Sequence, residues 1–351
     1  MFANGSTVIL AMMDDEDQSR RDIAPWPIGL ATRLQYPTVT LGLGSASLAA
    51  ILLWWSGAYN ATTPPPYWAS TGQMVSFAVA YPVLLGYIIG MVPFVTTRVR
   101  RHLEALKPVL ATDSAGSVAR LNRLDPIRLW IATGMGVLVG LANIDVVTIF
   151  GFRDAPPNPV DLSLAAVNMM LWVMMARVIY LLVHNAWLFC VLGERYTRVD
   201  LYRPQTLRPY AQAGILGLLV IMGGLALTPL QALDTEFRAE QYMWAFAVSL
   251  PVAIALPVLA MRGVRRSIIA TRRAELASLD EAIASASRDL DQPSTHRLNA
   301  LLDRRAYVTD QPSWPMDLRT VSRAAFYVVI PPLAWVGAAL VERAVDTLIS
   351  T

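Results

Sequence analysis

Residues 161–195 read DLSLAAVNMMLWVMMARVIYLLVHNAWLFCVLGER, and this stretch sets the class of the protein. It is an apolar run longer than the roughly 20 residues that a membrane-spanning helix needs. It also carries an arginine, Arg177, near its middle. An ionisable side chain at that depth is costly unless it faces protein or trapped water, so it marks a candidate functional site. The stretch therefore predicts a membrane helix with an embedded polar group.

The composition agrees with a membrane protein. Of the 351 residues, 55% are hydrophobic and 16% are charged, whereas a soluble domain carries about 25% charged residues. The excess of positive charge lies in alternate loops, which favours membrane topology over nucleic-acid binding. The single cysteine, Cys190, cannot form a disulfide or a thiolate metal site within one chain. We therefore expect an all-α, polytopic integral membrane protein.

Seven stretches are long and apolar enough to span a bilayer. They divide the chain into a disordered cytoplasmic tail over residues 1–30, six transmembrane helices with loops over 31–261, a cytoplasmic helical hairpin over 262–320, and a seventh transmembrane helix over 321–351. The predicted spans are roughly Thr38 to Gly57, Gln73 to Val95, Leu129 to Phe150, Leu162 to Leu182 with an extension to Leu192, Ala211 to Leu230, Tyr242 to Met261, and Arg323 to Val345.

The arginines predict the orientation. Alternate loops are basic. In the loops between them, Arg153 and Arg238 are the only basic residues. By the positive-inside rule the amino terminus is cytoplasmic and the carboxyl terminus lies outside. Lys107 is the only lysine of an arginine- and alanine-rich chain. We interpret that as a bacterial genome-composition bias and expect the bacterial inner membrane.

Small residues recur every four positions in two spans, which allows close approach of helix backbones. We expect packing within one chain, with a subunit interface as the alternative. The residues are Gly42, Ala46 and Ala50 in the first span and Ala132, Gly136 and Gly140 in the third.

The last span contains the adjacent prolines Pro331 and Pro332. Each removes a helical amide donor, so the pair predicts a hinge that breaks the helix into two pieces, as in transporters.

The polar segment over residues 262–320 has two apolar helical faces. They predict a hairpin whose first arm continues the sixth span, bent if anywhere near Gly263. Two roles are open: a lid against the protein's own core, or a coiled-coil contact between subunits. The faces consist of Leu276, Leu279, Ile283 and Leu290, followed by Leu298, Leu301 and Leu302.

Polar side chains recur within the spans. At 100° per residue, Arg177, Tyr180 and His184 lie along one side of their helix, and Asn168 points the opposite way. Asp145 in the third span lies too near the outer boundary to meet Arg177, so we predict that it contacts Asn168 instead. Two interpretations are open for the polar side: packing or snorkelling of Arg177 to the headgroups, or an ion or substrate pathway.

At the outer end of the seventh span, Glu342 and Asp346 would form acidic rings at a pore mouth if copies of this helix surrounded an axis. In a monomer they are a solvated helix end. The chain has no HExxH, Gly-x-Ser-x-Gly, P-loop or CxxC motif, so we expect no enzyme, no cofactor and no metal site.

The functional prediction is a channel-like or pore-forming protein, possibly oligomeric, with the seventh helix near the axis. The number and orientation of spans resemble the topology of insect odorant-receptor-type channels, but none of that family's motifs is present, so no residue role is transferred. The alternatives are a secondary transporter that uses Arg177, His184 and Asp145, and a non-transporting scaffold or sensor that acts through the hairpin. Expected partners are membrane lipids, copies of the chain and an unknown small ion or solute, but not nucleic acid.

Overall fold

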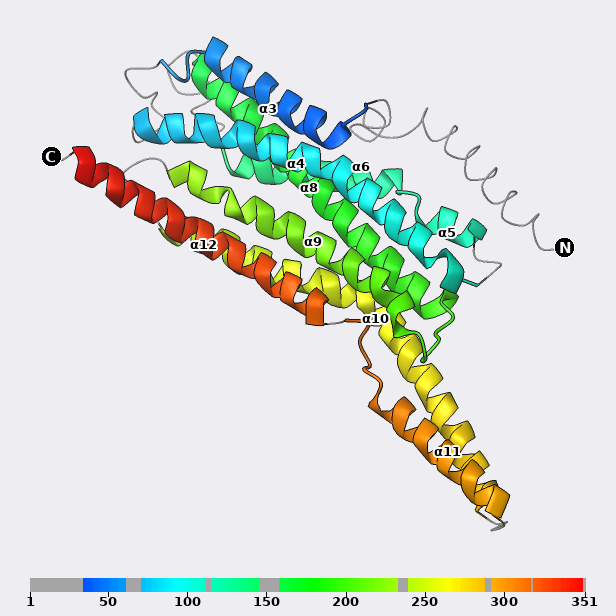
Figure 1. Cartoon of the computed structure of the whole chain (residues 1–351). Coiled ribbons are helices and arrows are strands. Elements are labelled where there is room, and N and C mark those ends of the chain that lie inside the picture. The colour runs from blue at the N-terminus through cyan, green and yellow to red at the C-terminus, as the bar shows by residue number, and fades with distance from the viewer. Residues whose placement is uncertain are drawn as a thin grey trace.

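A computed structural model describes residues 34–60, 71–111, 115–144, 158–232, 239–287, 292–316 and 318–349. Within them the chain is helical, apart from loops and one isolated antiparallel bridge between Leu110 and Thr197, so the all-helical class is confirmed. The predicted tail over residues 1–30 lies outside these ranges. The helices labelled in Figure 1 are α3 (Pro37–Trp55), α4 (Thr71–Leu106), α5 (Ala115–Leu121), α6 (Pro126–Ala142), α8 (Pro159–Val191), α9 (Arg208–Ala226), α10 (Ala239–Ala286), α11 (Gln292–Asp310) and α12 (Leu318–Ile349).

Several helices suit a membrane. Among the described residues, five segments are long and apolar enough to cross one, namely α3, α4, α6 with α5, α8 and α9. Large apolar side chains also face outward, for example Trp55 on α3 and Trp130 on α6, which are 84% and 75% exposed. Lipid would cover such surfaces, whereas water would not tolerate them over several helices. The count of seven spans stays a prediction, because α10 and α12 are not among the five.

Local sequence sets where two of these helices begin. The side chain of Asp125 caps α6 by accepting a hydrogen bond from the Ile127 amide at 2.9 Å. Asn158 caps α8 in the same way through the Val160 amide, also at 2.9 Å. In both cases a proline occupies the first helical position, where its missing amide costs nothing.

Helix α8 is central to the bundle and packs against α3, α4, α6, α9 and α10 (Figure 1). Helix α3 begins beside the middle of α4, where a Cβ on Gly90 would lie 2.9 Å from the Thr38 carbonyl oxygen, and α12 finishes at the end of the bundle opposite the projecting part of α10 (Figure 1). The end from which α10 projects also holds the end of α4, the start of α6 and the end of α8, and we call it the arginine-rich end. Its location in the cytoplasm stays a prediction. Its arginines include Arg98, Arg100, Arg101, Arg120, Arg123, Arg128, Arg195, Arg198, Arg203, Arg208, Arg262, Arg265 and Arg266.

The small-residue faces pack within the chain, as expected. A Cβ added to Gly136 of α6 would lie 2.6 Å from the Val173 Cα of α8. A Cβ on Gly42 of α3 would lie 3.1 Å from the carbonyl oxygen of Gly86 on α4. Backbones therefore touch at both crossings, and a larger side chain would separate the helices.

The expected break of the last span is not found. Helix α12 continues from Leu318 to Ile349 with Pro331 and Pro332 inside it. Helices α4 and α10 also continue through their prolines. A proline removes one helical hydrogen bond, and breaking further backbone bonds in an apolar medium would cost more. A bend at the pair stays a prediction.

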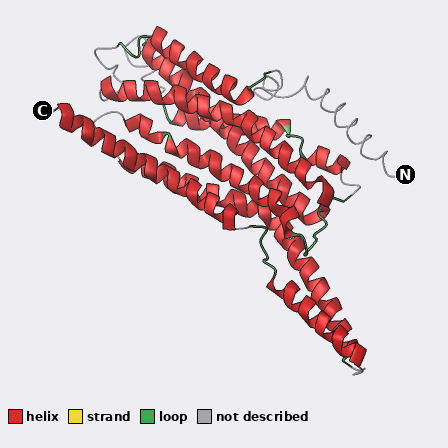
Figure 2. Cartoon of the chain, viewed as in Figure 1, coloured by secondary structure: helices red, strands yellow, loops and turns green. Residues whose placement is uncertain are grey.

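The predicted hairpin is present. Helix α10 is a single element of 48 residues that leaves the bundle and pairs with α11 (Figure 2). Leu279 and Val308 are buried between the two helices. We call this projecting pair the arm. The arm points away from the bundle (Figure 1), whereas a lid would lie against the protein's own core.

Candidate functional site

Two of the predicted polar residues, Tyr180 and His184, are neighbours on α8. The rings of Tyr180 and His184 are 6.0 Å apart, and Trp187 continues the row at 6.3 Å from His184. This row faces the turn between α5 and α6. His184 hydrogen-bonds the backbone of Leu121, and the Tyr180 hydroxyl donates to the Asp125 carbonyl across a long 3.5 Å. The row therefore seats the start of α6 against α8.

Two contacts fix the depth of Arg177. Toward the arginine-rich end, Tyr180 meets Asp125, the cap of α6. Toward the other end, the Ser163 hydroxyl donates to the Ser56 hydroxyl at the end of α3, at 2.7 Å. At 1.5 Å per residue, Arg177 lies about 4.5 Å from the first level and about 21 Å from the second. It is therefore much closer to the level at which α6 begins than to the end of α3.

The surroundings of Arg177 bear on the two interpretations that the sequence leaves open. Arg177 is half-buried, and no side chain among the described residues pairs with it. An arginine side chain is long enough to bring its guanidinium from this level to the headgroups. Within the described ranges no carboxylate pairs with Arg177, and both interpretations, snorkelling and an ion or substrate pathway, stay predictions.

Asn168 occupies a different face, also as expected. It is 3% exposed, and its Oδ1 has no hydrogen-bond partner in the part of the chain that the structure describes. The indole Nε1 of Trp172, one turn further along α8, also has none. Asp145, the predicted partner of Asn168, lies outside the described residues, so this contact stays a prediction.

The remaining predicted residues are on α12, away from α8. Just after Pro331 and Pro332, the indole of Trp335 donates to the Leu225 carbonyl of α9 at 3.4 Å. The side chains of Glu342 and Asp346 lie outside the described part of the chain. Those of the residues chosen from the sequence whose side chains are described do not converge on one site.

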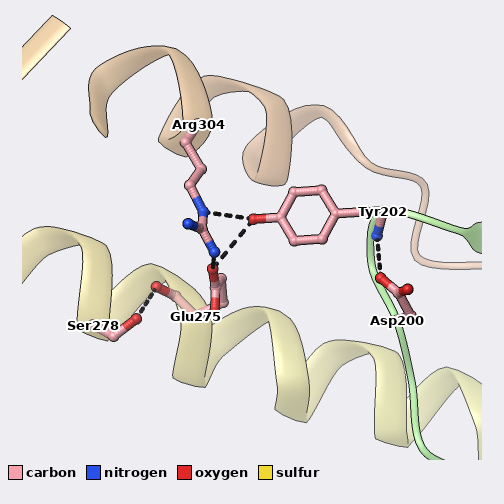
Figure 3. A network of polar contacts seen from close by, with 5 residues as sticks. All are labelled: Asp200, Tyr202, Glu275, Ser278 and Arg304. Carbon is pink, nitrogen blue, oxygen red and sulfur yellow. Dashed lines mark hydrogen bonds and ion pairs between the residues drawn. The ribbon is translucent and has the colours of Figure 1, made fainter. Parts of the chain in front are cut away.

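The densest polar network that joins separate elements was not predicted, and Figure 3 shows it. Arg304 of α11 donates to Glu275 of α10 and to the Tyr202 hydroxyl, both at 2.6 Å. That hydroxyl donates to the same carboxylate at 3.2 Å. Tyr202 lies in the loop between α8 and α9, where its amide donates to Asp200 at 2.9 Å. We call Tyr202, Glu275 and Arg304 the polar clamp.

Aromatic contacts support the clamp. The Tyr202 ring stacks on Tyr307 of α11, with centroids 5.7 Å apart and planes 4° apart. The Arg304 guanidinium also lies 5.4 Å from the Tyr202 centroid. Its hydrogen bonds to Glu275 and Tyr202 raise the pKa of Arg304, so the guanidinium stays charged throughout the accessible pH range. The clamp thus joins the α8–α9 loop to both helices of the arm.

The base of the arm is fixed independently. Arg266 of α10 pairs with Glu194 at the end of α8, at 2.9 Å, and Ser267 donates to the Gly193 carbonyl at 2.7 Å. A Cβ on Gly263 would lie 1.7 Å from the Cys190 carbonyl oxygen. The backbones of α8 and α10 are therefore in direct contact where the arm begins.

The hairpin pattern contained a signal for the clamp. Glu275 is one turn before Leu279, and Arg304 is one turn after Leu301, so antiparallel pairing of these apolar residues brings the two charges together. The contribution of Tyr202 has no such signal, because a loop position does not follow from helical periodicity.

Comparison of the chain with known protein families, curated proteins and solved structures found no match. The function must therefore be argued from the geometry of the membrane helices and the arm.

Proposed function

We propose that the protein is a membrane-embedded scaffold that holds a stiff helical arm at its arginine-rich end for contact with a second copy of the chain. One observation carries the proposal. Helix α10 passes without interruption from the bundle into the arm, and the polar clamp ties that arm to the α8–α9 loop. An arm held in this way is suited to presenting a surface in a fixed direction.

A second copy is the occupant that the arm suits best. Two helices share only one apolar seam, and a pair of hairpins can bury more surface as a four-helix bundle. On α11, Leu302 is 45% exposed beside the seam that Leu301 enters. Opposite charges also alternate along the arm, as in the pair Arg305 and Asp280 at 2.6 Å.

Cysteine cross-linking tests this contact in the full-length protein. In a Cys190→Ser background, Leu302→Cys should give a disulfide-linked dimer in vesicles after mild oxidation. Ala300→Cys is a matched control, because it is exposed on the opposite side of α11. Failure of Leu302→Cys to cross-link above the control would refute the homotypic contact.

A channel-like assembly is the second candidate. Helix α12 packs on α9, and it exposes Phe326, Leu333 and Val336 on other sides, at 61%, 59% and 57%. Copies arranged around this helix would put Glu342 and Asp346 at a pore mouth. Purified protein in liposomes would then carry an ionic current that neutralising either residue abolishes. Flux lost with Arg177→Ala would instead favour a secondary transporter.

The location belongs to the same proposal. The scaffold would lie in the bacterial inner membrane with the arm in the cytoplasm, because the positive-inside rule places arginine-rich loops there. Membrane lipids are then its first partners. The proposal includes no catalytic step.

A further inference from the structure

Helix α10 changes from apolar to basic at Arg262. Over residues 242–261 it carries no charged side chain. The change lies level with the end of α8, because the backbones of the two helices touch at Gly263 and Cys190, and α8 becomes charged at Glu194. Both helices therefore leave their apolar stretch together, which is the level at which a bilayer would present its headgroups.

Three arginines lie in the first turn of α10 beyond this level, and one of them has an acidic partner. Arg266 pairs with Glu194 of α8. Arg262 and Arg265 are exposed, and no carboxylate among the described residues pairs with either. At 100° per residue they lie outside the side of α10 that meets α8 through Gly263. Side chains three positions apart on a helix are neighbours, so these two charges repel unless an anion compensates them.

The return segment from α11 to α12 holds Arg265 in place. The Arg265 guanidinium lies over the Trp314 ring, 4.6 Å from its centroid. Two turns further on the same side of α10, Arg272 donates to the backbone carbonyls of Gln311, at 3.2 Å, and Thr309. A guanidinium that stacks on a ring uses its flat face and keeps its N–H groups free at the edge. Arg265 therefore presents oriented donors to a ligand.

We propose that Arg262, Arg265 and Trp314 bind the phosphate of one anionic phospholipid headgroup at the base of the arm. The planar edge of a guanidinium matches two phosphate oxygens in parallel hydrogen bonds. Arg262, one turn nearer the bundle, supplies a second positive charge. Tryptophan is enriched at the headgroup level of membranes, where one part of its ring is apolar and the other is polar.

Apolar side chains next to the arginines favour a lipid over a free anion. Ile254 and Val258 are 51% and 46% exposed. At 100° per residue they lie on the same side of α10 as Arg262 and Arg265. Acyl chains would cover this strip while the phosphate meets the arginines, whereas a soluble anion would leave the strip bare. The inference rests on the proposed membrane location and adds the lipid class, but it does not need the contact between arms.

Native mass spectrometry of the full-length protein in detergent tests the lipid affinity. Phosphatidylglycerol should bind more tightly than phosphatidylcholine with the same acyl chains. Arg262→Gln and Arg265→Gln should each weaken binding of the first phosphatidylglycerol about fivefold. Arg273→Gln is the matched control, because Arg273 is exposed on the same side of α10 but about 16 Å further along the arm. No loss in the first two variants, or an equal loss in all three, would overturn the site.

Two further measurements separate the ring and the lipid from simple charge. Trp314→Leu retains every arginine and should still lower the affinity about two- to fivefold. Millimolar inorganic phosphate should not displace the bound lipid. Unchanged affinity in Trp314→Leu, or displacement by phosphate, would overturn the proposal.

A structure in nanodiscs that contain phosphatidylglycerol gives the geometric test. We expect a phosphate oxygen about 2.7–3.2 Å from a guanidinium nitrogen of Arg265, with an acyl chain along Val258. A protein carboxylate on Arg265, or no lipid there, would overturn the site. The Leu302→Cys cross-link tests the contact between arms separately, so failure of one experiment is distinguishable from failure of the other.

Discussion

The cost of a charge in a membrane depends on its depth, and Arg177 shows why depth cannot be measured along one helix. Helix α8 continues past the level at which α6 begins, as the contact of Tyr180 with Asp125 shows. Counting from the ends of the apolar run places the arginine centrally, whereas counting from its neighbours places it close to the level at which α6 begins. The neighbouring helices give the better measure of depth, because lipid surrounds the whole bundle and not one helix.

Replacing this arginine should therefore be tolerated. We expect Arg177→Leu to fold and to change the free energy of unfolding by no more than about 1 kcal/mol, because no charged partner of Arg177 lies within the described ranges. Thermal unfolding in detergent would measure this. A loss of several kcal/mol would mean that a buried carboxylate, such as Asp145, needs the arginine.

Single side chains also control the arm. In Glu275→Gln, the clamp keeps its shape but loses the charged acceptor, so we expect a wider distribution of arm positions. Spin labels at Gly116→Cys and Glu281→Cys, in a Cys190→Ser background, would report the width of the distance distribution. Glu104→Gln breaks an exposed ion pair with Arg100 within α4 and should leave this width unchanged. An equal effect of both changes would contradict the role of the clamp.

Two helix pairs in this bundle, α6 with α8 and α3 with α4, pack closely because glycines at their crossings carry no side chain. Helix α6 touches α8 through Gly136 and Gly140, while its other sides carry large exposed apolar residues. Its attachment therefore depends on how closely one face can approach, and not on the amount of apolar surface that the helix carries.

This dependence gives a sharp comparison between two neighbouring glycines. Gly136→Ala should destabilise the protein by about 1–3 kcal/mol, because the new methyl group has no space against Val173. Gly134→Ala should be neutral or stabilising by up to about 1 kcal/mol, because it adds helix propensity in open space. Unfolding of both variants in detergent would test this. Equal effects would mean that α6 is not seated as described.

The molecule as a whole has two dissimilar ends, one rich in arginine and bearing the arm. Labelling of single cysteines with a membrane-impermeant reagent would test the orientation, since Cys190 is the only native cysteine and is buried. We expect Gly116→Cys and Glu281→Cys to react from the same side and Asn60→Cys from the other. Reaction of positions 60 and 116 from one side would exclude the proposed topology.

Much of this architecture is predictable from sequence, because hydropathy and helical periodicity are local properties. Each of these features follows from a pattern within one stretch of sequence: the apolar runs, the glycine faces of α3 and α6, and the apolar seam of the arm. The partner glycines on α4, Gly86 and Gly90, are recognised only when α3 is placed against them. The clamp and the depth of Arg177 depend on three elements at once, and the continuity of α12 through two prolines depends on the cost of exposing backbone to lipid.

The continuity of α10 also has a mechanical consequence. Beyond its contact with α8 at Gly263, the helix extends to Ala286, about 35 Å at 1.5 Å per residue. A tilt of only about 10° at that fulcrum would swing the far tip by about 6 Å over this length. The polar clamp holds α10 at Glu275, between that fulcrum and the tip, so its hydrogen bonds decide whether a small shift within the lipid becomes a displacement that a neighbouring molecule can detect.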